Sequence, residues 1–281
     1  MIRKNEKEIP RLKTAANGLP CLYFPALEET GLVRHAFTTR AGGVSKGVYA
    51  ALNLSFSREG DPRENVLENY RRVAEAMGVE LESFVLTYQT HTTAVRQVGK
   101  EDRGKGVLRE RDYRDVDGLI TNEPGITLGT FFADCIPLYF LDPKTKSIGL
   151  AHSGWRGTAG QMGAAILKAM EEAYGTRAGD VLAAIGPGIC RDCYQVSEEV
   201  YEAFSRCFAS GEMEMIFTPD TPGHYLLDLW LANVLVLKNA GVREENISCS
   251  NICTAENTDM LYSHRKMGEN RGNMAAFLAL R

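Results

Sequence analysis

Apolar residues recur at helical spacing in several segments of the chain, and these segments predict helices. The clearest is DPRENVLENYRRVAEAMGV (residues 61–79), where Asp61 is suited to cap the first turn and Gly78 to end the helix. In DLWLANVLVLKNAGV (residues 228–242), Asp228 is the expected N-cap. The same spacing predicts two further helices, at residues 163–174 and 197–208.

Short apolar runs between turn signals predict strands. Residues 116–155 contain several such runs, separated by the turn signals NEPG and DPKTK. SFVLTYQTH (residues 83–91) predicts another strand, and residues 93–98 are expected to continue it or pair with it. Similar runs begin near His35 and lie at residues 181–189, 246–254 and 274–280. These strands form hairpin-like groups as well as alternating with helices, which favours an α+β fold with mixed sheets over a doubly wound fold.

Length and charge narrow the class of protein. The 281 residues are compatible with one large domain over residues 1–281, in which residues 1–18 are expected to be a mobile or hairpin-forming segment. The net charge of −4 argues against nucleic-acid binding, which usually needs a basic surface. No run approaches the roughly 18 apolar residues of a membrane span, and the N-terminus has no apolar signal region. Seven cysteines in a long chain favour a reducing cytoplasm over a disulfide framework.

Three apolar runs end at a residue that can bind a soft metal ion. VLTYQT ends before His91, LGTFFAD before Cys135 and SIGLA before His152. If these ends share one rim of a sheet, they form a site of two nitrogens and one sulfur, which suits Zn²⁺ and leaves a fourth position open. Copper also accepts such ligands. The alternative is that each histidine is a structural hydrogen-bonding residue, because no HxxxH or CxxC pair joins these three residues.

Two glycine-rich turns are candidate anion sites. GLAHSGWRGTAG (residues 149–160) places Arg156 before a predicted helix, whose free amide groups would favour an anion. TTRAGGVSKG places Arg40 before a similar turn. Neither matches the nucleotide P-loop, and the alternative for both is a tight turn with a solvent-exposed arginine. Asp134, directly before Cys135, could orient a water, accept a proton or cap a turn.

The remaining cysteines and the C-terminal tail leave alternatives open. Cys190 and Cys193 form a CxxC pair and Cys249 and Cys253 a CxxxC pair, but residues 194–248 separate them, far more than a compact zinc ribbon uses. Structural thiols are favoured over a structural zinc site or a redox pair. SHRKMGENRGN (residues 263–273) is either a solvated loop or an arginine-lined wall of the site.

Several of these stretches together resemble one known family. TYQTHTTAV, DGLIT, FFADCIPLYFLDP, GLAHSGWRGTAG, AIGPGI, CYQV and a late CT…SHR…RGN occur in the family's order, from about His35 onward. This is the YfiH/LACC1-like family, which has been labelled polyphenol oxidase or laccase domain and is described as purine nucleoside phosphorylases. The family's common HAGWRG is HSGWRG here, a change between small residues.

The resemblance implies a fold, a metal site and an activity. The fold is a layered α/β/β/α arrangement shared with deamidase domains of certain bacterial toxins. The metal ligands are His91, Cys135 and His152, and the metal is usually zinc. The activity is phosphorolysis of adenosine, inosine and S-methyl-5'-thioadenosine, with adenosine deamination as a second reaction. We therefore expect Asp134, Cys135 and Arg156 to be catalytic and Arg40 and Arg156 to bind phosphate.

Three other functions remain open at this stage. A copper-dependent polyphenol oxidase is disfavoured, because the chain has five histidines and no HxH pair. A cysteine hydrolase or amidase would use Cys135 as nucleophile and His152 as base. A non-enzymatic scaffold would use the metal only for stability. The expected partners are purine nucleosides and phosphate, without nucleic acid or membrane, and a homodimer is an open alternative to a monomer.

Overall fold

Two six-stranded sheets form the centre of the computed structural model, which describes residues 1–281. The first sheet has the order β1 (Arg11–Thr14), β2 (Pro20–Tyr23), β3 (Val33–Thr38), β15 (Met274–Leu280), β7 (Thr127–Phe132) and β4 (Phe84–Leu86). The second has the order β14 (Ile247–Cys249), β10 (Leu182–Ile185), β8 (Ile136–Asp142), β9 (Ser147–Ser153), β6 (Gly118–Thr121) and β5 (Val95–Gln97). A three-stranded sheet follows the order β11 (Gln195–Ser197), β13 (His224–Leu227) and β12 (Phe217–Pro219).

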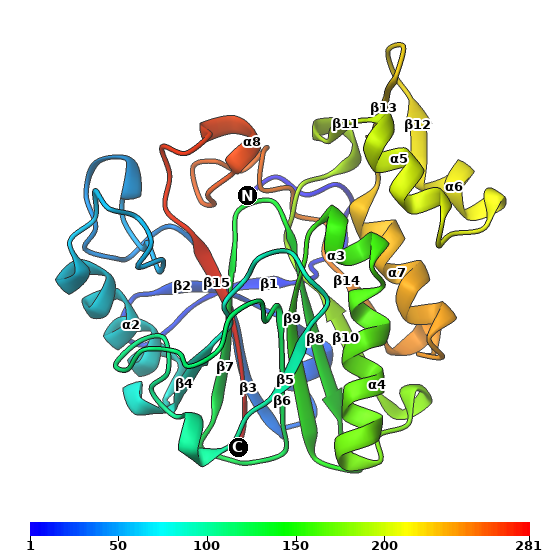
Figure 1. The fold of residues 1–281 in the computed structure, drawn as a ribbon. Coiled ribbons are helices and arrows are strands. Elements are labelled where there is room, and N and C mark those ends of the chain that lie inside the picture. Colours follow the sequence, from blue (N-terminus) through cyan, green and yellow to red (C-terminus); the bar gives the residue numbers. More distant parts are fainter.

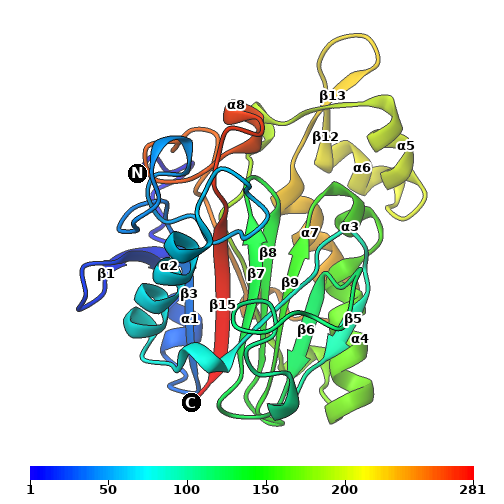
Figure 2. The ribbon, with the colours of Figure 1, turned by 60° about the vertical axis from the view of Figure 1, so that its left-hand side comes forward.

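Helices cover the outer faces of the two large sheets, so the molecule has four layers (Figures 1 and 2). Helix α2 (Arg63–Met77) packs on the first sheet, whereas α4 (Met162–Tyr174) and α7 (Leu229–Asn239) pack on the second. Three buried apolar clusters fill the three spaces between the layers. Both large sheets combine parallel and antiparallel pairs, which confirms the predicted α+β fold with mixed sheets in an α/β/β/α arrangement.

Shorter helices lie at the ends of the strands. The α-helices are α1 (Pro25–Glu28), α3 (Trp155–Ala159), α5 (Glu198–Ser205), α6 (Ser210–Ile216) and α8 (His264–Met267). The 3₁₀ helices are η1 (Gly47–Tyr49), η2 (Leu81–Ser83), η3 (Lys100–Asp102), η4 (Ala178–Asp180), η5 (Arg191–Cys193) and η6 (Glu244–Asn246). None of the helices is both long enough and apolar enough to cross a membrane.

The central strands are buried along their whole length because both of their faces are covered. Every residue of β8, β9 and β15 is buried. On one side these strands face the other large sheet, and on the other they face a helix layer. Continuous apolar runs such as SIGLA and MAAFLAL therefore predict strands here without any alternation of polar residues.

Helix boundaries follow the sequence signals with one correction. Asp228 caps α7 by accepting a hydrogen bond from the amide of Leu231 at 2.9 Å, as predicted. Gly78 ends α2 in a left-handed conformation, with φ of 64°, also as predicted. The prediction that Asp61 caps α2 is wrong, because Pro62 occupies the N-cap and the Asp61 carboxylate accepts hydrogen bonds from Ser45 and Asn53.

The segment around His91 also differs from the prediction. The strand expected at residues 83–91 ends at Leu86, and residues 93–98 neither continue it nor pair with it. Strand β4 pairs with β7 in the first sheet, whereas β5 pairs with β6 in the second. Residues 87–94 therefore cross from one sheet to the other, and this crossing carries His91.

Candidate active site

The structure brings His91, Cys135 and His152 together. Their donor atoms all lie within 4.8 Å of one another. His91 comes from the crossing segment, Cys135 directly precedes β8, and His152 lies near the end of β9. The rings of His91 and His152 meet edge to face, with their centroids 4.9 Å apart.

The β8–β9 hairpin accounts for the proximity of Cys135 and His152. Pro137 pairs with His152 and Ile136 with Ser153, so the same register places Cys135 opposite Gly154. A Cβ atom at Gly154 would lie 2.8 Å from the Cys135 sulfur and 3.2 Å from the His91 ring. Glycine is therefore required there because any side chain would fill the space between the two donors.

Asp117 holds both histidines, although the sequence analysis did not single it out. Its fully buried carboxylate accepts a hydrogen bond from His152 Nδ1 at 2.8 Å. It also accepts from the backbone amides of Thr90, His91 and Thr92, at 3.0, 3.2 and 3.1 Å. These bonds stabilise the left-handed backbone of His91, whose φ is 65°. The pairing of β6 with β9, which the sequence does not give, explains its position: Gly118 pairs with Ala151, so Asp117 lies opposite His152.

The charges of these side chains are strongly coupled. Burial by itself raises the pKa of the Cys135 thiol, but the imidazoles of His152 and His91 lower it to about 6. Burial by itself lowers the pKa of His152, but Cys135 and Asp117 raise it to about 9. Burial opposes ionisation of Asp117, yet its bond to His152 keeps its pKa below the usual value. Without a metal ion, Cys135 and His152 therefore form a thiolate–imidazolium pair at neutral pH.

The three side chains are a suitable donor set for a metal ion. Asp117 engages Nδ1 of His152 and leaves Nε2 as its free donor nitrogen. Two imidazole nitrogens and one thiolate match the three-ligand zinc sites that keep a fourth position open. The same donors accept copper, so the donor set does not distinguish the two metals.

The three donors lie in the wall of a cavity of about 770 Å³. Its aromatic lining residues are Phe56, Tyr88, Phe131, Trp155 and Tyr194. Its basic lining residues include four arginines, namely Arg111, Arg156, Arg265 and Arg271. A chain with a net charge of −4 thus concentrates positive charge around one cavity, an arrangement that favours an anionic ligand.

Arg156 lines the cavity, but the structure places Arg40 elsewhere. The Arg156 guanidinium stacks on the ring of Trp155, 4.1 Å from its centroid. Arg40 is absent from the cavity lining, because its guanidinium donates to the carbonyls of Ala50 and Thr258 at 2.9 and 2.7 Å and lies over Tyr262. The hydrogen bonds of Arg40 therefore support a structural role.

Asp134 also lines the cavity, with both carboxylate oxygens engaged. Oδ1 accepts a hydrogen bond from the Thr254 hydroxyl and Oδ2 from the Arg265 amide, each at 2.6 Å. The backbone φ of Asp134 is 88°, so these bonds hold a left-handed turn directly before Cys135. Of the three roles considered for Asp134, this geometry favours stabilisation of the turn.

The glycine-rich turn at residues 149–160 is organised differently from the expectation. The expected helix after Thr158 or Gly160 is preceded by the five-residue helix α3, which begins at Trp155. Arg156 therefore projects from within a helix, and α4 begins only at Met162. His264, Arg265 and Arg271 also line the cavity, which favours the arginine-lined wall over a solvated loop for residues 263–273.

Comparisons with known proteins agree with the sequence resemblance. The family model described as multi-copper polyphenol oxidoreductase laccase matches residues 34–281. The chain is 36% identical over 249 residues to purine nucleoside phosphorylase YlmD of Bacillus subtilis, with 87% of each chain covered. It is 34% identical over 239 residues to adenosine deaminase RL5 of an unidentified prokaryote, with 84% of this chain and 90% of that protein covered.

The structural comparison leads to the same family. The crystal structure of YlmD from Geobacillus stearothermophilus matches with a TM-score of 0.88 at 35% identity, covering 97% of this chain and 99% of that one. The similarity therefore extends over both large sheets and the residues around the cavity. With the family model matching residues 34–281, this chain belongs to the YfiH/YlmD family, whose model carries the polyphenol oxidoreductase laccase description.

Proposed function

We propose that this protein is a zinc-dependent purine nucleoside phosphorylase that acts on adenosine, inosine and S-methyl-5'-thioadenosine and also deaminates adenosine. The observation that carries the proposal is the arrangement of His91, Cys135 and His152 in the wall of a cavity lined by aromatic rings and arginines. The names of the relatives support the two reactions, since YlmD is named a purine nucleoside phosphorylase and RL5 an adenosine deaminase.

His91, Cys135 and His152 would hold the zinc ion, and Asp117 would orient His152 toward it. A bound zinc ion supplies a Lewis acid whose positive charge favours the anionic form of a nucleophile at neutral pH. The protein shields Asp117 and His152 from solvent, because His152 is 4% exposed and Asp117 is fully buried. A nucleoside has to enter through the open side of the cavity, where His91 is exposed.

The aromatic residues of the cavity are suited to bind a purine. Tyr88 and Trp155 each carry an arginine over one face, with guanidinium-to-centroid distances of 4.7 and 4.1 Å. A purine stacked on such a ring gains apolar contact on one face and keeps its polar edge free for hydrogen bonds. We assign purine binding to this aromatic side of the cavity.

The arginines of the cavity are suited to bind phosphate beside the ribose. Arg271 lines the cavity and is 8% exposed, so solvent screens its charge only weakly there. Burial and the nearby Arg58 lower the pKa of Arg271 to about 10, so it stays protonated at neutral pH. In phosphorolysis a phosphate oxygen bonds to C1′ as the C1′–N bond breaks. The purine leaves with the electron pair and takes up the proton that phosphate loses.

The proposal predicts metal-dependent turnover of adenosine. Purified protein should release adenine only when phosphate is present and inosine whether or not phosphate is present. Both products should disappear on chelation and return with added zinc, as measured by liquid chromatography. Absence of both products from folded protein with bound zinc would contradict the proposal.

The position of Arg156 predicts a selective loss of one reaction. Arg156→Ala should lower phosphorolysis of adenosine by roughly 10-fold to 100-fold, because it removes a charge-assisted hydrogen bond to phosphate. Deamination should change much less, since it uses no phosphate. Arg206, which is exposed and outside the cavity lining, provides the matched control Arg206→Ala. Equal losses in both reactions for Arg156→Ala would exclude a specific role in phosphate binding.

The hydrogen bonds of Asp117 predict a change in metal affinity. Asp117→Asn removes the negative charge beside His152 and should weaken zinc binding by about 10-fold to 100-fold. Asp115→Asn is the matched control, because Asp115 is exposed and accepts hydrogen bonds from the hydroxyl groups of Thr90 and Thr92. Competition with a chromophoric chelator measures both affinities. Unchanged zinc affinity in Asp117→Asn would show that Asp117 does not orient a metal ligand.

A cysteine hydrolase is the second candidate, favoured by the Cys135–His152–Asp117 arrangement. The thiolate, its histidine partner and a carboxylate that orients the histidine are also the components of a cysteine nucleophile site. This candidate requires Cys135 to react with substrate, whereas the phosphorylase proposal requires it to bind zinc.

Alkylation separates the two candidates. In zinc-free protein, Cys135 should react with iodoacetamide at a rate that rises as pH increases through about 6, because its thiolate forms there. Cys207 is exposed as a residue, but partial desolvation of its thiol raises its pKa. Its alkylation should therefore need a higher pH, and Cys207 serves as the internal reference. Peptide mass spectrometry measures both rates. The phosphorylase proposal predicts that zinc protects Cys135, and alkylation at an unchanged rate with zinc bound would favour the hydrolase.

A further inference from the structure

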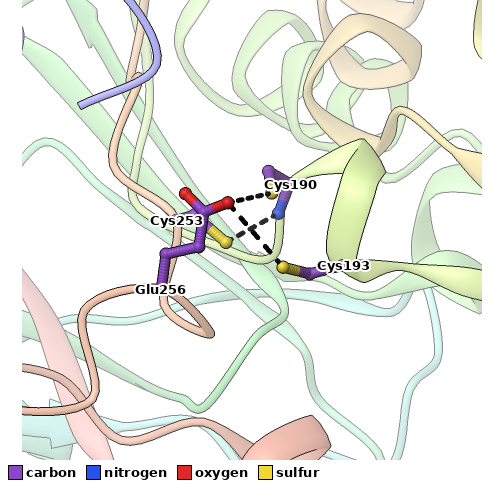
Figure 3. A group of neighbouring side chains, drawn as sticks. All are labelled: Cys190, Cys193, Cys253 and Glu256. Carbon is purple, nitrogen blue, oxygen red and sulfur yellow. Dashed lines mark hydrogen bonds between the residues drawn. The ribbon is translucent and has the colours of Figure 1, made fainter. Parts of the chain in front are cut away.

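A second group of metal-binding side chains lies outside the catalytic donor set. It consists of Cys190, Cys193, Cys253 and Glu256, whose donor atoms all lie within 4.8 Å of one another. Figure 3 shows the three sulfur atoms and the carboxylate gathered around one point. Cys190 and Cys253 are buried, whereas Cys193 and Glu256 are partly exposed. We name these four residues the cysteine cluster.

Neighbouring parallel strands bring the two halves of the cysteine cluster together. Cys190 and Cys193 follow β10, whereas Cys253 and Glu256 follow β14, and these two strands pair in parallel. Parallel strands end at the same edge of a sheet, so the segments that follow them emerge side by side. A further bridge between Gly188 and Cys253 continues this pairing up to the cluster.

The spacing within each half matches the ligand pairs of structural zinc sites. Cys190 and Cys193 are separated by two residues, and so are Cys253 and Glu256. Two such pairs form the C-x₂-C…C-x₂-C pattern of zinc sites, here with a glutamate as the fourth ligand. Cys249, the other cysteine considered with Cys253, does not belong to the cluster. The sequence does not show the four-cysteine pattern, because the fourth ligand is a glutamate and not a cysteine.

The distances fit a single tetrahedral ion. A zinc ion with Zn–S bonds of about 2.3 Å and Zn–O bonds of about 2.1 Å places tetrahedral sulfur and oxygen ligands about 3.6 Å apart. Oε1 of Glu256 lies 3.8 Å from the Cys190 sulfur and 4.0 Å from the Cys193 sulfur. The amide of Cys190 donates to the sulfur of Cys253 at 3.3 Å, a contact that stabilises a metal-bound thiolate.

The charge that the cysteine cluster would carry as a set of metal ligands also suits a divalent cation. Bound to a metal ion, three thiolates and a carboxylate would carry four negative charges, in a region where Cys190 and Cys253 are buried. The ammonium of Lys4 contacts Glu256 and lies 2.9 Å from Asp192, so one positive charge is already present. A divalent ion would neutralise two of the remaining charges, and zinc is the divalent ion that thiolates favour in a tetrahedral site.

We propose that Cys190, Cys193, Cys253 and Glu256 form a second, structural zinc site that joins the segment after β10 to the segment after β14. Four protein ligands close the coordination shell, so this ion has no position for substrate. Its effect on the cavity is indirect. Ile189 and Tyr194, on either side of Cys190 and Cys193, line the cavity, and Thr254 donates to Asp134. The site therefore holds one wall of the cavity in place.

Zinc stoichiometry tests this proposal. Full-length protein, prepared under reducing conditions with zinc, should lose one zinc equivalent per chain when Cys253 or Cys193 is replaced by alanine, as measured by inductively coupled plasma mass spectrometry. Cys249→Ala is the matched control and should lose none. The expected loss is relative to the wild type, so it does not depend on whether His91, Cys135 and His152 bind zinc.

Cobalt spectroscopy keeps the test valid if an alanine variant folds poorly. Cys135→Ala protein loaded with Co²⁺ has no thiolate in the catalytic donor set, so thiolate-to-cobalt absorption should come from the cysteine cluster. Glu256→Gln, which retains all three thiols, should change the shape of this absorption. No such absorption in folded Cys135→Ala protein, or a zinc content that Cys253→Ala leaves unchanged, would overturn the proposal. A disulfide within the cluster of freshly reduced protein would also overturn it.

Discussion

The antiparallel register of β6, β9 and β8 is the constraint on which the geometry of His91, Cys135 and His152 depends. Within this register Asp117 lies opposite His152, and Cys135 lies opposite Gly154. A slip of one residue would turn every side chain of a strand to the other face of the sheet. Such a slip is disfavoured because β8 and β9 are packed on both faces, and each face is filled by side chains that fit the present register. The apolar packing of the central strands therefore also sets the distances between the polar residues at their ends.

A second constraint is the cost of holding charge inside the protein. The Asp117 carboxylate is fully buried and receives hydrogen bonds from three consecutive backbone amides as well as from His152. A buried carboxylate and a buried thiolate need a positive partner nearby. Either a proton on His152 or a metal ion between the three donors can supply it, so protons and metal compete for the same residues.

The residue pattern was sufficient for an α+β fold with mixed sheets, and it made the grouping of His91, Cys135 and His152 one of two open interpretations. The layered arrangement and the choice of that grouping came from the family resemblance. The sequence marked the segments that carry these residues, although the strand before His91 ends at Leu86. It was not sufficient for Asp117 or Glu256, whose roles depend on which strand lies beside which. Arg40 and Arg156 occupy similar glycine-rich turns, yet the Arg40 guanidinium is occupied by backbone carbonyls. Whether an arginine in such a turn is engaged by backbone carbonyls depends on tertiary contacts, which the local sequence does not reveal.

The two donor groups differ both in the number of side chains that they offer a metal ion and in their places in the fold. Three donors leave a coordination position free, and they face a cavity of about 770 Å³. Four donors leave no coordination position free. The cysteine cluster lies behind the cavity wall that contains Ile189 and Tyr194. Thr254 lies between Cys253 and Glu256 in the chain and bonds to Asp134, the residue directly before Cys135. Because this short path joins the two groups, rigidity at the cysteine cluster helps to fix the position of the Cys135 thiolate.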